Sequence, residues 1–303
     1  MDSPLLMPED APEGHRCGYV ALAGQPNVGK STLLNALIGQ KLSIVTRKPQ
    51  TTRHRIPAML SADDHQIIFL DTPGIVVPRY GLHRAMMHAV RDAVADADLL
   101  VFIADASRGV PDTPGMDIVQ GRPAILALNK MDLIRQEDAL PLAEAWLALG
   151  DFNEVVPISA RKGTNLDILL AAILQRLPIG PPLYPKDMIS DRPERFFVAE
   201  IIREKVFRLY RQEIPYSTEV RIVHFEEREH EKDFVSAEIV LTADTQKGIL
   251  IGKRGHALKR LGTAARKDIE VFLGRSVYLD LHVKVRSDWR NRPAFLRSFG
   301  YRA

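Results

Sequence analysis

The sequence predicts two domains in succession: an α/β domain with a mostly parallel sheet, then a smaller α+β domain. Short apolar runs alternate with helical segments through residue 178, as in strand–helix–strand units. Proline-rich residues 179–193 then interrupt regular structure. A helix, two alternating strands, two helices and a last strand follow, in the order αββααβ. We therefore expect a disordered leader at 1–15, a first domain at 16–178, a connector at 179–193 and a second domain at 194–303.

Gly24-Gln-Pro-Asn-Val-Gly-Lys-Ser31 fits the phosphate-loop pattern G-x-x-x-x-G-K-[ST]. Its glycines allow the backbone to curl so that successive N–H groups point at one anion. The loop follows a strand-like run at 19–23 and opens a helix near Thr32, whose N-terminus favours phosphate. The pattern predicts that Lys30 contacts the β- and γ-phosphates and that the Ser31 hydroxyl binds Mg²⁺.

A second strand-like run, 66–70, ends in Asp71-Thr-Pro-Gly74. A carboxylate at the carboxyl end of a parallel strand beside a phosphate loop is placed to hold Mg²⁺. Gly74 is expected to sense a γ-phosphate through its N–H group. A first mobile switch segment is expected within residues 41–55, where Thr51 or Thr52 would close on Mg²⁺, and we favour Thr52.

Further strand-like runs at 99–104 and 124–128 lead to Asn129-Lys-Met-Asp132. A carboxylate at Asp132 can accept from the two donors on guanine N1 and N2, which adenine does not offer. Asn129 would hold the loop together and Lys130 would pack on the base. The run 155–158 leads into Ser159-Ala160, where a backbone N–H can reach guanine O6. The motifs in this order indicate GTP.

These motifs define the expected nucleotide site. The residues expected to bind nucleotide are Gly24, Asn27, Val28, Gly29, Lys30, Ser31, Thr32, Asn129, Lys130, Asp132, Ser159 and Ala160. The expected magnesium ligands are Ser31, Thr52 and Asp71. The residues expected to act in catalysis are Lys30, Asn27, Asp71 and Gly74.

In the second domain, Gly252-Lys-Arg-Gly255 lies between two predicted helices. Glycines let such a loop press against a sugar-phosphate backbone, so the αββααβ order with this loop predicts an RNA-binding domain of the KH type, type II. Residues 249–251 are expected to form the floor of its groove. The helix from 194 to 213 is expected to expose a polar face of Arg203, Glu204, Lys205 and Arg208. The expected RNA-binding residues are Ile251, Gly252, Lys253, Arg254, Gly255, Lys259 and Arg260.

Charge and composition agree with a polyanion partner. Residues 181–303 hold 24 Lys and Arg against 18 Asp and Glu, whereas the first 180 residues hold 17 against 20. The single cysteine, Cys17, excludes a disulfide framework and fits a reducing compartment. The acidic first fifteen residues resemble neither a secretory signal nor a transit peptide. We expect a cytoplasmic protein and leave open peripheral association with the inner face of the cell membrane.

The nucleotide motifs of the first domain and the glycine loop of the second, together with Pro49-Gln-Thr-Thr-Arg53, closely resemble the Era family of bacterial GTPases. The resemblance runs from about Gly18 to Tyr301. Gln25 stands where the family commonly has Arg, and Arg254 where the loop often has Gly. The resemblance implies a monomer that binds GTP or GDP with Mg²⁺, hydrolyses GTP and assists assembly of the small ribosomal subunit. It also implies that the KH domain binds the 3′ end of the small-subunit ribosomal RNA.

The mechanism is less determined by sequence. Ile75 stands where Ras-like proteins place a water-orienting Gln, so slow intrinsic hydrolysis is expected. Asn27 matches an asparagine that helps hold K⁺ in related GTPases, so K⁺ is a candidate cofactor. Two alternative functions stay open: an RNA-binding or chaperone module with nucleotide as a structural ligand, and a membrane-associated cell-cycle GTPase.

Overall fold

The computed structural model describes residues 12–46, 48–110 and 115–302. The chain forms two compact units. The first holds Thr52–Val77, Met86–Asp191 and the chain before Ile44, and the second holds Ile44–Thr51, Pro78–Ala85 and the chain from Arg192. Most of the leader expected at 1–15 lies outside the described residues.

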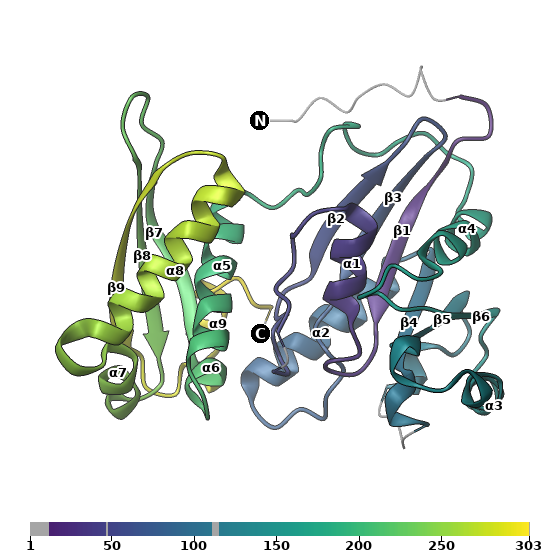
Figure 1. Cartoon of the computed structure of the whole chain (residues 1–303), viewed down its shortest axis with the longest axis horizontal. Helices are drawn as coiled ribbons and strands as arrows, with labels where there is room; N and C mark the ends of the chain where they lie inside the picture. The colour runs from purple at the N-terminus through teal and green to yellow at the C-terminus, as the bar shows by residue number, and fades with distance from the viewer. Residues whose placement is uncertain (1–11, 47, 111–114, 303) are drawn as a thin grey trace. The chain divides into compact units, whose positions relative to one another are not determined.

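A six-stranded sheet forms the centre of the first unit, in the order β2-β3-β1-β4-β5-β6 (Figure 1). All neighbouring pairs are parallel except β2 with β3, so the predicted mostly parallel α/β domain is confirmed. The strands are β1 (Arg16–Ala23), β2 (Ile56–Ser61), β3 (His65–Asp71), β4 (Leu99–Asp105), β5 (Ala124–Asn129) and β6 (Glu154–Pro157).

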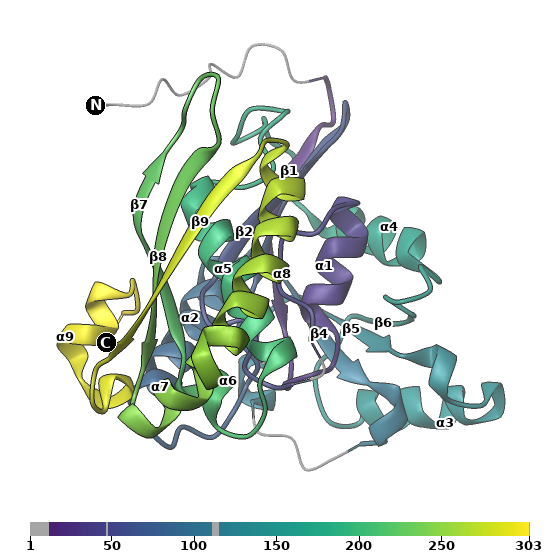
Figure 2. The ribbon, with the colours of Figure 1, turned by 60° about the vertical axis from the view of Figure 1, so that its left-hand side comes forward.

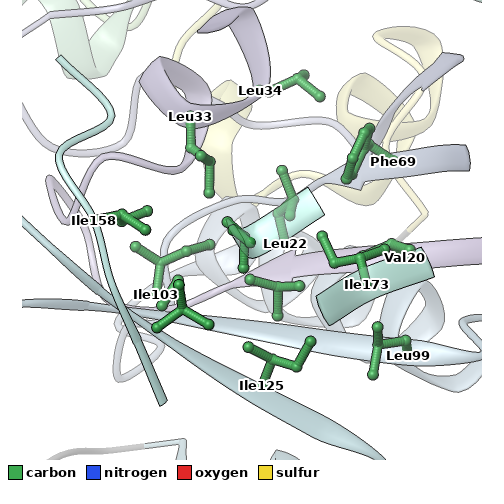
Figure 3. Packing of buried hydrophobic residues seen from close by; sticks show 14 of the residues in the cluster. Val20, Leu22, Leu33, Leu34, Phe69, Leu99, Ile103, Ile125, Ile158 and Ile173 are labelled. Atoms are coloured by element: carbon green, nitrogen blue, oxygen red, sulfur yellow. The ribbon is translucent and has the colours of Figure 1, made fainter. Parts of the chain in front are cut away.

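Helices cover both faces of this sheet. On one face, α1 (Lys30–Ile38) and α4 (Leu166–Arg176) pack on the strands. Figure 3 shows Leu33 and Leu34 of α1 pointing toward the same core as Val20 and Leu22 of β1. The other face receives α2 (Gly81–Ala95) and α3 (Gln136–Leu147), the latter through Trp146 against Phe102. Two-sided cover explains why the strands are apolar along their whole length.

Strand β2 was not expected from the sequence. This strand pairs antiparallel with β3, with Ala58 opposite Phe69, and it contains Pro57. Proline is tolerated on an edge strand, where no ladder partner needs its missing N–H group. The proline therefore marks an edge here, although it weakens the strand pattern in the sequence.

Residues 183–190, in the proline-rich stretch, lie against β2 and β3. The side chain of Gln66 accepts hydrogen bonds from the backbone N–H groups of Leu183 and Tyr184, at 2.7 and 2.9 Å. The N–H of Met59 donates to the carbonyl of Ile189 at 2.8 Å. The Met59 bond pairs one backbone group of the edge strand β2, and the Gln66 bonds hold the proline-rich stretch beside β3.

The second unit contains a three-stranded sheet in the order β7-β8-β9. Its strands are β7 (Glu219–Glu226), antiparallel to β8 (Asp233–Leu241), and β9 (Val277–Val285), parallel to β8. Two helices, α5 (Glu194–Leu209) and α8 (His256–Leu273), cover one face of this sheet (Figures 1 and 2). With α7 (Asp244–Ile251) between β8 and α8, the predicted αββααβ order of a KH domain is confirmed. Two short helices, α6 (Ile214–Ser217) and α9 (Pro293–Ser298), were not predicted.

The prediction of an exposed polar face on α5 is wrong for three of its four residues. Arg203, Glu204 and Lys205 are buried, and only Arg208 is exposed. Arg203 forms an ion pair with Glu200 and also donates to the carbonyl of Thr51 within the second unit. Paired charges of this kind can be buried because each group keeps hydrogen-bond partners. Glu200 lies one turn before Arg203 on the same helix, but the Thr51 carbonyl comes from elsewhere in the chain, so the sequence periodicity could not reveal it.

Within the described ranges, no helix is both long and apolar enough to cross a lipid bilayer.

Leu34 provides a test of the core in the first unit. We expect Leu34→Ala to lower the free energy of unfolding by about 2–5 kcal/mol, because a fully buried side chain leaves a cavity. Leu140→Ala on α3 is the control, since Leu140 is 68% exposed, and its effect should stay within about 0.5 kcal/mol. Urea unfolding followed by circular dichroism measures both. Equal effects of the two changes would contradict the packing described here.

Candidate functional site

The phosphate loop has the backbone conformation that its glycines were expected to allow. Gly24 and Gly29 have φ of 148° and 107°, and Asn27 between them has φ of 65°. A Cβ on Gly24 would lie 2.2 Å from the carbonyl oxygen of Ile103. A Cβ on Gly29 would lie 2.2 Å from Nδ2 of Asn129. Gly29 also caps α1, so the loop leads directly into unpaired N–H groups, with Thr32 in the first helical turn.

Lys30 is buried at the start of α1. Its Nζ donates to the carbonyl oxygens of Gly24 and Gln25, both at 3.0 Å. Burial lowers the pKa of Lys30 to about 8, and the nearby Asp71 carboxylate opposes this shift. The Lys30 ammonium group is therefore held by carbonyls of the same loop whose backbone N–H groups would bind a phosphate.

Ser31, Thr52 and Asp71 form a cluster beside this lysine. The Ser31 hydroxyl donates to Asp71 Oδ2 at 2.9 Å and lies 2.9 Å from Thr52 Oγ1. Thr52 Oγ1 donates to the same carboxylate oxygen at 3.4 Å. Burial raises the pKa of Asp71, and Lys30 opposes the shift. By contrast, the hydroxyl of Thr51 donates to the carbonyl of Lys48, outside this cluster.

The cluster fits a magnesium ion. Asp71 Oδ1 is buried and has no hydrogen-bond partner among the described residues. A buried carboxylate oxygen without a partner is costly, and a hard cation with oxygen ligands would satisfy it. The two hydroxyls beside it are oxygen ligands of the same kind.

Gly74 lies against the phosphate loop. A Cβ on Gly74 would fall 2.8–2.9 Å from three atoms of Pro26, so only glycine fits this contact. The N–H of Ile75 donates to the carbonyl of Gly24 at 3.0 Å, and the Ile75 side chain is buried. The segment after β3 is therefore tied to the loop through backbone atoms.

The expected guanine loop is held to the phosphate loop by Asn129. Its Nδ2 donates to the carbonyl of Val28 at 2.7 Å, and its Oδ1 accepts from the N–H of Ala160 at 2.9 Å. Ser159 donates from its hydroxyl to Asp132 Oδ1 at 2.6 Å. The structure thus brings the expected 129–132 and 159–160 segments together, with the Asp132 carboxylate oriented by Ser159.

Asp105 belongs to this region and was missed by the sequence analysis. It ends β4, is buried, and forms ion pairs with Lys130 and Arg108. Lys130 also donates to the carbonyl of Asn27 at 2.8 Å. The signal that identified Asp71, a carboxylate at the end of a buried strand, applies equally to Asp105.

In the second unit, Gly252-Lys-Arg-Gly255 forms a tight loop between α7 and α8. Gly252, Arg254 and Gly255 have φ of 71°, 50° and 77°. Arg254 therefore has the left-handed conformation that glycine adopts without strain. Lys253 and Arg254 are exposed, and neither has an ion pair among the described residues.

A groove of about 540 Å³ runs between α8 and β9, and we call it the α8–β9 groove. Its lining includes Gly255 and Lys259, with apolar surface from Leu258, Leu279 and Leu281. Residues 249–251, expected as its floor, do not line it. Leu250 is fully buried in the core, while Ile249 is exposed. The β9 residues were not predicted from the sequence, because this strand and helix α8 are far apart along the chain and meet only in the folded domain.

Comparisons with known proteins agree with both units. A family described as 50S ribosome-binding GTPase matches residues 19–130, and the KH domain family matches residues 213–290.

Similar proteins extend along nearly the whole chain. A GTPase ERA-like, chloroplastic protein from Arabidopsis thaliana is 46% identical over 294 residues, covering 95% of this chain and 69% of the relative. GTPase Era from Trichlorobacter lovleyi is 44% identical over 290 residues, covering 95% of this chain and 98% of the relative.

Two solved structures match closely, each with a TM-score of 0.91, 42% identity and coverage of 95% of this chain and 100% of the other. One is a point variant of Era from Aquifex aeolicus bound to GDP·AlF4⁻. The other is Era in complex with MgGDPNP and nucleotides 1506–1542 of 16S ribosomal RNA.

A phosphate loop, the cluster of Ser31, Thr52 and Asp71, and the 129–132 segment lie on one mostly parallel sheet, and a KH domain follows. Together with the family matches, they define a GTP-hydrolysing enzyme with an RNA-binding module. Its cofactors are GTP or GDP and Mg²⁺. The chain belongs to the Era family of GTPases.

Gly29→Ala tests the fit between the phosphate loop and the guanine loop. The added Cβ would overlap Asn129 Nδ2, so we expect GDP affinity to fall about 10- to 100-fold. Gly39→Ala is the control, because Gly39 also has a positive φ but has open space around its Cβ. Its effect on affinity should stay within about twofold. Isothermal titration with GDP measures both, and an unchanged affinity in Gly29→Ala would contradict the contact.

Proposed function

We propose that this protein is a GTP-controlled assembly factor of the small ribosomal subunit. Its KH domain would bind the single-stranded 3′ end of the small-subunit ribosomal RNA. Support comes from the similar Era protein that was solved with MgGDPNP and nucleotides 1506–1542 of 16S ribosomal RNA. One observation carries the GTP control: Thr52, from the expected switch segment, contacts Ser31 and Asp71.

The switch that we propose depends on that cluster. Ser31, Thr52 and Asp71 would hold Mg²⁺, which neutralises charge on the β- and γ-phosphates when bound. The N–H of Gly74 would contact the γ-phosphate and so sense whether GTP or GDP is bound. After hydrolysis and phosphate release, Thr52 and the segment after Asp71 would lose their shared ligand, which is an order–disorder switch.

The residues at the site favour catalysis by positioning and electrostatics. Lys30 would stabilise negative charge on the phosphates. Asn27, Asp71 and Gly74 would line the rest of the site around the transferred phosphoryl group. Ile75 is buried and has no group that can orient water, so we propose a slow intrinsic rate. A second element must then accelerate hydrolysis.

The RNA site that we propose combines the glycine loop with the start of α8. Gly252 and Gly255 allow close approach of the RNA backbone, and Lys253 and Arg254 add charge there. Ile251 would contribute apolar surface. Bases would enter the α8–β9 groove, beside Lys259.

We propose that the protein works as a monomer in the cytoplasm, and its single cysteine is compatible with that reducing compartment. Contact of its basic surface with the inner face of the membrane stays a prediction.

The function is tested by RNA affinity in two nucleotide states. We expect protein loaded with a GTP analogue to bind a single-stranded copy of the small-subunit 3′ end at least about tenfold more tightly than protein loaded with GDP, because a coupling of that size is typical of a switch. Fluorescence anisotropy at fixed salt measures this, with a scrambled RNA as the control. Equal affinity in both states would favour the alternative RNA-binding module with nucleotide as a structural ligand.

K⁺ dependence is a separate test. If Asn27 helps to hold K⁺ beside the phosphates, replacing K⁺ with Na⁺ at constant ionic strength should lower the GTP hydrolysis rate about tenfold or more. In Asn27→Ala the two salts should give the same low rate. A wild-type rate that does not depend on the cation would exclude this role.

A further inference from the structure

The carboxylate of Asp105, at the carboxyl end of β4, uses its two oxygens for different partners. Asp105 lies opposite Asn129 in the parallel β4–β5 ladder, and its side chain is only 3% exposed. Oδ1 accepts from the N–H and the hydroxyl of Ser107, at 3.1 and 2.6 Å, and so caps the short 3₁₀ helix that follows β4. Oδ2 instead faces two cations, Lys130 and Arg108.

Lys130 links this carboxylate to the phosphate loop. Its Nζ contacts Asp105 Oδ2 and donates to the carbonyl of Asn27 at 2.8 Å. The backbone of Lys130 is in the left-handed region, with φ of 68°, and so is that of Asn27, with φ of 65°. A residue with a Cβ adopts this conformation at a cost, so surrounding contacts must hold it. The ammonium group of Lys130 is therefore fixed between the phosphate loop and β4.

Fixing both ends of Lys130 also orders the stem between them. The side chain is 27% exposed, and its four methylene groups lie between a held ammonium and a held backbone. The stem of a long charged side chain can cover apolar surface while its tip keeps polar partners. A side chain that is ordered before the ligand arrives saves the entropy cost of ordering it on binding.

We propose that Asp105 is a positioning residue for the guanine base. By holding the Lys130 ammonium against the phosphate loop, its carboxylate keeps the Lys130 stem in place to pack on the face of the base. Asp105 acts through Lys130 and needs no contact of its own with the nucleotide. Nucleotide binding alone tests this role, whichever RNA the KH domain binds.

The negative charge of Asp105 by itself would have the opposite effect on binding. Nucleotide phosphates are anions, so a nearby carboxylate repels them, and its removal would strengthen binding. A positioning role predicts weaker binding when the carboxylate is removed. The direction of the change therefore distinguishes positioning from a general effect of charge.

Asp105→Asn separates the helix cap from the pairing with cations. Asparagine caps a helix about as well as aspartate, so its side-chain oxygen can keep the bonds to Ser107. Its amide group has no charge to pair with Lys130. Asp151→Asn is the matched control, because Asp151 is exposed and precedes β6, at the opposite edge of the sheet from the nucleotide loops.

We expect Asp105→Asn to lower the affinity for GDP about tenfold, because a hydrogen bond between charged groups is lost. The affinity for inosine diphosphate, which lacks the 2-amino group of guanine, should fall by the same factor, since Asp132 at the base edge is unchanged. Lys130→Met keeps an apolar stem without the ammonium, and it should also lose about tenfold. Adding Asp105→Asn to Lys130→Met should cause no further loss, because the two residues act as one unit. Asp151→Asn should stay within about twofold of wild type.

Isothermal titration of the full chain with each nucleotide in the presence of Mg²⁺ measures these affinities. Unchanged or stronger GDP binding in Asp105→Asn would overturn the proposal, as would an additional loss on top of Lys130→Met. A changed ratio of the two affinities would also overturn it, because Asp105 would then act on the base edge at Asp132. Circular dichroism follows the folding of every variant, and an unfolded Asp105→Asn beside a folded Lys130→Met would show a purely structural role and refute the inference.

Discussion

The side chain of Asn129 holds the nucleotide site together. Its amide joins the phosphate loop at Val28 to the segment at Ala160, and it occupies the space where a Cβ on Gly29 would lie. These loops follow β1, β5 and β6, whose carboxyl ends share one edge because the strands are parallel. A buried hydrogen bond that loses one partner costs about 1–3 kcal/mol, so the geometry of all three loops depends on this residue.

The two functional surfaces treat negative charge differently. Lys30 is buried and held by two carbonyls, so the nucleotide site offers an anion a fixed cation and fixed backbone dipoles. Lys259, Arg260 and Lys267 of α8 are exposed and have no ion pair within the described chain, and they act through the field that they share. Ions in solution screen exposed charges more strongly than buried ones. Salt should therefore weaken RNA contacts far more than nucleotide contacts.

Local motifs made much of the site predictable. The phosphate loop, Asp71 and the 129–132 segment carry their geometry in glycines, strand ends and short spacing, which a sequence shows directly. Partners that come from distant segments were not predictable. Arg203 looked like an exposed residue of an amphipathic helix, yet it is buried with Glu200 and the carbonyl of Thr51. The apolar residues that β9 contributes to the α8–β9 groove were not predicted for the same reason, since only folding brings that strand to α8.

The second unit contains segments from separate parts of the sequence, and this affects how the chain can be cut into folded fragments. Ile44–Thr51 and Pro78–Ala85 come from the first third of the sequence but belong to the same compact unit as the KH domain. A single cut near residue 192 would remove both segments from that unit. The fragment would then expose the surface around Arg203 that Thr51 contacts. The boundary between folding units in this protein is therefore not a point in the sequence, and limited proteolysis at the connector need not yield two intact domains.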